Sequence, residues 1–213
     1  MLSYLFDLMF LLVTLSVAYI VSRHSAVHAA AFFIATLISS LLSITTFEGV
    51  SARIARTYLL PSDFLILRHL QFVISIAIFV AAAALLAWCI QLILPETPKL
   101  STRMEMTGRW VFGTLVGYLF AAFLLTVLAT FPTRREFGGA FMPEAHRRPG
   151  PIMAAAPDYQ FLALVEYTCG NAFALTGGNW TLGRPIISAD AKHGRWSSFP
   201  IRYARWRESQ FGE

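Results

Sequence analysis

The chain has 213 residues, of which 56% are hydrophobic and only 14% are charged, and its formal net charge is +5. Soluble domains carry about 25% charged residues, and here the charges leave long uncharged runs that a soluble core cannot absorb. The composition therefore excludes an ordinary soluble domain and indicates an all-α integral membrane protein. No block of like charge predicts nucleic-acid binding, and the modest positive charge favours contact with anionic headgroups of the lipid bilayer.

Four apolar stretches are long enough to cross a bilayer, which takes about 20 residues of helix; they are residues 2–22, 26–47, 70–94 and 110–131. In lipid every backbone polar group needs an internal partner, so each stretch is expected to be helical. Residues 1–131 are predicted to form a transmembrane domain of four helices. The first stretch lacks a basic start and is long for a signal peptide, so we expect it to span. The second follows after three residues, so a re-entrant course remains an alternative for it.

Two shorter helices are predicted outside these spans. Ile54, Ala55, Tyr58 and Leu59 recur at helical spacing with two arginines off that face, which predicts a short amphipathic helix in the membrane interface. Residues 132–213 are expected to form a water-facing tail that is largely irregular, because prolines and glycines interrupt it. Within that tail, apolar residues at helical spacing predict a helix over about 159–169, with Asp158 as its cap.

The fourth apolar stretch carries small residues on one face. Gly113, Gly117 and Ala121 are spaced by four, so they form a ladder that lets two helix backbones approach closely. The contact could lie within the protein, which is the commoner use of such a ladder. Alternatively, it could be a seam for a second copy of the chain or for another membrane protein.

Four polar residues inside the apolar stretches are candidates for a function. Asp7 is the acidic one, and a carboxylate at membrane depth is a candidate functional group, although near the start of a helix it can also reach the headgroups. Thr36, Ser40 and Ser43 share one face of the second helix. Such hydroxyls usually bond a neighbouring helix or their own backbone, and the alternative is that they line a polar path.

Motifs for catalysis, cofactors and metals are not evident. His24 and His28 are four residues apart, but two ligands without a third are weak evidence for a metal site. Cys89 and Cys169 are expected to be unpaired thiols. The glycosylation pattern at Asn179 is short and matters only in a secretory compartment. With no phosphate loop, HExxH or nucleophile elbow, we expect no cofactor and no enzymatic activity.

The order of these features resembles the colicin V production (CvpA) family of bacterial inner-membrane proteins. Three stretches carry the resemblance: FDLMFLLVTLSVAYIVSRHSAVHAAAFFIATLIS, TGRWVFGTLVGYLFAAFLLTVL and PDYQFLALVEY. They look like the family's opening with an Asp entering helix one, its glycine-rich last helix after a basic residue, and a short helix that follows in some members. The sequence departs from the pattern at His24, where the family often has Gly, and at Gly108, where an Asp often precedes the Arg.

The resemblance implies a multi-pass protein of the bacterial inner membrane, linked to toxin production or export and to envelope function. The first hypothesis is therefore a membrane scaffold or accessory protein. The second is a structural subunit of a larger membrane complex, and the third is a small transporter or channel in which Asp7 and the hydroxyl face line a path. Basic residues are almost evenly divided between the two sides of the predicted spans, so the sequence does not orient the termini.

Overall fold

The structure is a computed structural model, and it describes residues 3–58, 64–94, 101–131, 147–168, 186–187 and 195–196. Four of its helices are long and apolar enough to cross a membrane. They are α1 (Ser3–Ser22), α2 (Ala26–Tyr58), α3 (Phe64–Ile93) and α4 (Thr102–Leu128). The chain is thus an all-α membrane protein with four transmembrane helices.

The second helix is longer than the sequence predicts. The expected interfacial segment does not form a separate helix up to residue 58, because α2 runs without a break from Ala26 to Tyr58. A continuous helix keeps the backbone bonds satisfied as the chain leaves the apolar zone, and this explains why no break is needed at Phe47. The rest of the predicted interfacial helix, from Leu59, lies outside the described residues. The second helix is a long helix rather than a re-entrant turn.

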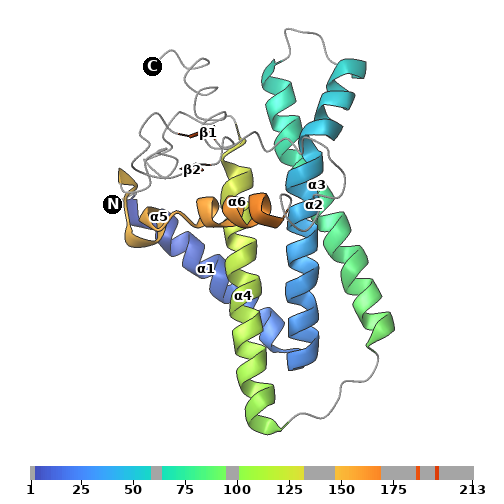
Figure 1. Cartoon of the computed structure of the whole chain (residues 1–213), viewed down its shortest axis with the longest axis vertical. Coiled ribbons are helices and arrows are strands. Elements are labelled where there is room, and N and C mark those ends of the chain that lie inside the picture. Colours follow the sequence, from blue (N-terminus) through green and yellow to red (C-terminus); the bar gives the residue numbers. More distant parts are fainter. Residues whose placement is uncertain are drawn as a thin grey trace.

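Helix α4 is the centre of the bundle. It packs against α1 and α2, whereas α3 packs mainly against α2 and touches α4 only slightly. Figure 1 shows α1 crossing the bundle obliquely, so that it meets the base of α2 near their shared turn and diverges from it toward the N-terminus. The upper ends of α2 and α3 extend together beyond the other helices. One side of α1 consequently meets few protein neighbours, and its exposed side chains are mostly apolar.

Two short helices follow in the tail. They are α5 (Pro151–Ala154) and α6 (Pro157–Tyr167), and α6 lies across α4 in Figure 1. The helix α6 begins two residues before the predicted start. Ala156 precedes it in a left-handed conformation with φ 52°, and Pro157 occupies the first turn, where the missing N–H leaves no bond unmade. Asp158 therefore lies inside the helix rather than at its cap. The end predicted at residue 169 lies outside the described residues.

Phenylalanines join three helices in the buried core. The Phe79 and Phe123 rings are stacked with centroids 4.5 Å apart, which ties α3 to α4. The Phe161 ring of α6 meets Phe123 edge-on at 6.0 Å. Such aromatic pairs add about 0.5–1.5 kcal/mol beyond the area they bury. The tail helix α6 thus packs against the transmembrane bundle. The remaining described tail is a two-residue antiparallel pairing of β1 (Ile186–Ile187) with β2 (Arg195–Trp196).

Candidate functional site

The glycines of α4 lie against the backbone of α1. A Cβ atom built on Gly113 would lie 2.8 Å from the Ala18 carbonyl oxygen, and one on Gly117 would overlap the carbonyl oxygen of Thr14. Only glycine permits this approach, because the neighbouring atoms are backbone and cannot move aside. The structure therefore places both glycines at an internal contact between the first and last spans. Ala121, one turn further, is buried in the wall of a cleft described below.

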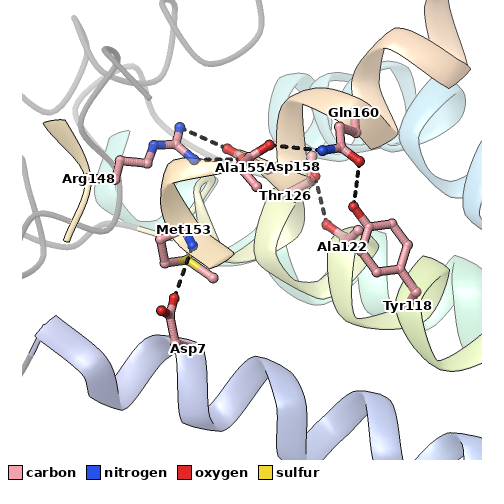
Figure 2. Close-up of polar contacts among 9 residues, drawn as sticks. All are labelled: Asp7, Tyr118, Ala122, Thr126, Arg148, Met153, Ala155, Asp158 and Gln160. Carbon is pink, nitrogen blue, oxygen red and sulfur yellow. Dashed lines mark hydrogen bonds and ion pairs between the residues drawn. The ribbon is translucent and has the colours of Figure 1, made fainter. Parts of the chain in front are cut away.

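Asp7 binds the start of α5. Its side chain is 6% exposed, and its carboxylate oxygens accept the backbone N–H groups of Ile152, at 3.3 Å, and Met153, at 3.0 Å. The Asp7–Met153 contact is visible in Figure 2. The first N–H groups of a helix have no partner within the helix, so the Asp7 carboxylate satisfies two of them. Asp7 thus joins the first transmembrane helix to a segment 145 residues later in the chain.

Gly150 makes room for this contact. It precedes α5 with φ 92°, a conformation that residues with side chains rarely adopt. A Cβ atom there would lie 2.7 Å from Cγ of Asp7 and would push the carboxylate away from the N–H groups. The glycine is therefore needed for its backbone angle and for the space that it leaves.

A buried ion pair holds the next turn of the tail. Arg148 donates two hydrogen bonds to Asp158, at 2.6 and 3.1 Å, and both side chains are nearly inaccessible. The guanidinium also lies over the Tyr159 ring at 4.6 Å. Burial lowers the pKa of Arg148, but the charge and hydrogen bond of Asp158 outweigh it, so the net pKa lies above its ordinary value. The arginine therefore stays charged, and its ion pair with Asp158 joins residue 148 to the first turn of α6.

A third polar contact links α6 to α4. The Tyr118 hydroxyl donates to Oε1 of Gln160 at 2.6 Å, and Nε2 of Gln160 donates to the carbonyl of Ala155 at 2.9 Å. Figure 2 shows these contacts beside the Arg148–Asp158 pair. We call the three contacts, centred on Asp7, Arg148–Asp158 and Tyr118–Gln160, the tail lock. Together they fix residues 148–160 on the bundle formed by α1 and α4.

The hydroxyl face of α2 is used for packing at one of its three positions. Ser43 donates to the carbonyl of Ser75 on α3 at 2.7 Å and pairs with the Ser75 hydroxyl at 2.9 Å. Ser40 is buried but bonds within α2, to the carbonyl of Leu37. Thr36 is half-buried. Among the described residues, the buried hydroxyls of Thr14 and Ser39 have no hydrogen-bond partner, and neither belongs to the predicted face.

The turn between α1 and α2 is fixed by the start of α4. Glu105 accepts the backbone N–H of Ala26 at 2.8 Å and so binds the first turn of α2. His28 pairs with the Ser25 hydroxyl through Nδ1 at 2.9 Å, and its ring centroid lies 6.5 Å from that of His24. Within the described ranges, no three His, Cys, Asp or Glu side chains gather as metal ligands.

An apolar cleft lies beside the tail lock, and Met153 belongs to both. It has a volume of about 230 Å³ and is partly open to the outside. Helices α1 and α4 form its two long walls, and Phe72 of α3 and Met153 of α5 complete it. Its lining residues are all apolar: Phe6, Met9, Phe10, Val13, Phe72, Ala121, Leu124, Leu125, Leu128 and Met153. Met153, one of the two residues whose N–H groups bind Asp7, thus also contributes its side chain to the cleft.

Comparisons with known proteins return no match: no family model, no curated protein and no solved structure is similar to this chain at a significant level.

The sequence makes Asp7 stand out but not its partners. Arg148, Gly150 and the two N–H groups of α5 lie in a segment of prolines and glycines that carries no periodic signal. A clue was available at Gly150-Pro151, because glycine before a proline commonly marks a helix start. Nothing in the sequence, however, pairs that start with a residue of the first helix.

Proposed function

We propose that this chain is a multi-pass scaffold or accessory protein of the bacterial inner membrane, of the kind implied by its resemblance to the colicin V production family. Its role would lie in toxin production or export, or in envelope function. The observation that carries the proposal is the tail lock, in which a carboxylate within the first span binds the tail at α5. A scaffold needs such a fixed connection, because it must hold a water-facing segment in one place on the membrane.

The three stretches that carry the resemblance support the same proposal. They contribute to α1, α4 and α6, and these helices pack on one another: the glycines of α4 meet α1, and α6 lies on α4. The Asp of the first stretch binds the turn that leads directly into the third. Residues far apart in the sequence thus form one structural unit. Such a unit is consistent with a scaffold that docks a partner protein through the whole unit.

The polar groups that a transporter would use are bound to other groups of this protein. Their state favours a scaffold that docks other proteins over a transporter. Asp7 places both carboxylate oxygens on backbone N–H groups, so it is occupied as a structural ligand. Ser43 is occupied by Ser75 across the α2–α3 contact. A transport site needs groups that can exchange partners with a solute, and these two have fixed internal partners. We therefore propose a non-enzymatic, non-transporting role, with structural membership of a larger complex as the alternative.

The test is complementation in the native host. Deleting the gene should reduce secretion of a bacteriocin or increase dye permeability of the envelope, and the wild-type chain should reverse whichever of these defects appears. Asp7→Ala should fail to do so although it inserts normally, while Leu8→Ala, a change at an exposed neighbour, should succeed. Full complementation by Asp7→Ala would contradict a function of the locked tail.

Two biochemical outcomes separate the alternatives. A stoichiometric heteromeric complex that survives mild detergent and disappears on Asp7→Ala would favour the structural subunit. Solute or ion flux in proteoliposomes that is lost on Asp7→Asn would favour the transporter. Purified chain with neither property, combined with the complementation result above, is the outcome that we expect for a scaffold.

A further inference from the structure

The apolar cleft beside the tail lock has the character of a ligand site rather than of a packing gap. A cavity of about 150 Å³ lined by Leu, Ile and Phe stays dry and binds small apolar molecules. This cleft is larger, at about 230 Å³, and no polar side chain lines it. Water in it would find almost no polar surface to bind on its walls. Its occupant must therefore be apolar.

The size of the cleft limits how much of an apolar molecule it can hold. Its volume is about half as large again as that of a cavity of about 150 Å³, which takes one molecule of the size of benzene. A slender hydrocarbon chain suits a space of this size.

The position of the cleft identifies the source of that chain. Its walls are the transmembrane helices α1 and α4, at the end of the bundle where α1 begins and α4 ends. The cleft is partly open, and both of its long walls are helices apolar enough to cross a membrane. The hydrocarbon around such helices consists of phospholipid acyl chains, so an acyl chain is the apolar molecule that surrounds the cleft.

We propose that this cleft binds one acyl chain of a membrane phospholipid, beneath a roof that α5 provides. Met153 is suited to this roof, because its unbranched, polarizable side chain adapts to an irregular occupant. The roof is held in place through the Met153 N–H, which Asp7 accepts at 3.0 Å. The bound lipid stays with the folded protein and does not exchange freely with the other lipids of the bilayer.

The experiment is native mass spectrometry of the full chain. The protein is reconstituted in vesicles of palmitoyl-oleoyl-phosphatidylcholine, extracted in mild detergent and examined for retained lipid. Wild type should retain one phospholipid. Ala121→Phe places a ring in the cleft from its buried wall and should reduce the lipid-bound species at least tenfold. Ala81→Phe, the same change on the exposed face of α3, should leave it unaltered.

Folding is checked by thermal unfolding in detergent. Should Ala121→Phe not fold, Val13→Phe makes the same test from a half-buried position on the opposite wall. The proposal is overturned if wild type retains no lipid, or if the folded cleft variant retains as much as wild type. It is equally overturned if the added mass is that of a free fatty acid, or if a protein partner replaces the lipid.

Discussion

Replacing Asp7 by Ala removes the acceptor that holds the first turn of α5. Hydrogen bonds to charged groups contribute about 1.5–3 kcal/mol each. The bond to Met153 is 3.0 Å, whereas the bond to Ile152, at 3.3 Å, is slightly longer than the usual range and is therefore weak. We therefore take about 2–3 kcal/mol for the pair. Since about 1.4 kcal/mol corresponds to a factor of ten, local opening of α5 should become about 30- to 150-fold more populated.

The assay is amide hydrogen exchange in detergent micelles, followed at Ile152 and Met153. Asp7→Ala should accelerate exchange at these two amides by the factor given above, because they exchange through local opening. Asp7→Asn retains one acceptor oxygen and should accelerate exchange less. Leu8→Ala is the matched control at an exposed position. Unchanged exchange at Met153 in Asp7→Ala would refute the role of the carboxylate as the ligand of α5.

Three further predictions concern packing, the buried ion pair and topology. Gly117→Leu should lower the free energy of unfolding by about 1–3 kcal/mol or more, which would appear as a lower unfolding temperature at unchanged oligomeric state. Gly49→Ala is the control and should leave the stability unchanged, because nothing lies within 4 Å of its Cβ position. Arg148→Ala should destabilise by about 3–5 kcal/mol through an unpaired buried Asp158, and the double change Arg148→Met with Asp158→Leu should recover most of the loss; equal losses in both variants would contradict the pairing. In a chain without native cysteines, single cysteines at His24 and Ser101 should label from one side of the membrane and those at Arg53 and Ala155 from the other; labelling of all four from one side would contradict four spans.

The spans could be predicted from the sequence because their physical signal is local. A run of about 20 apolar residues has one stable form in lipid, and four such runs became four helices. The end of α2 could not be predicted in the same way. Arg53 and Arg56 mark where the chain leaves the apolar zone, but a helix can continue through that boundary, and α2 does so up to Tyr58.

The site was only half visible in the sequence. The spacing of Gly113 and Gly117 shows that they share a face, but it does not say that the opposing backbone is that of Thr14 and Ala18. Likewise, Asp7 stands out as an acid in an apolar run, while its partner is two N–H groups 145 and 146 residues away. Contacts between distant segments leave no periodic pattern, and backbone donors leave no residue signature at all.

The lock and the cleft share one residue, and this makes the two testable against each other. The Met153 N–H donates to Asp7, and the fully buried Met153 side chain lines the cleft. Because both groups belong to one residue, opening of α5 would also remove the roof of the cleft. Asp7→Ala should therefore weaken lipid retention as well as speed exchange at the Met153 amide, and added phospholipid should slow that exchange in the wild type, because a ligand that binds the closed state stabilises it by mass action. Faster exchange with undiminished lipid retention would mean that the roof is not needed, and that the walls of α1 and α4 hold the chain alone.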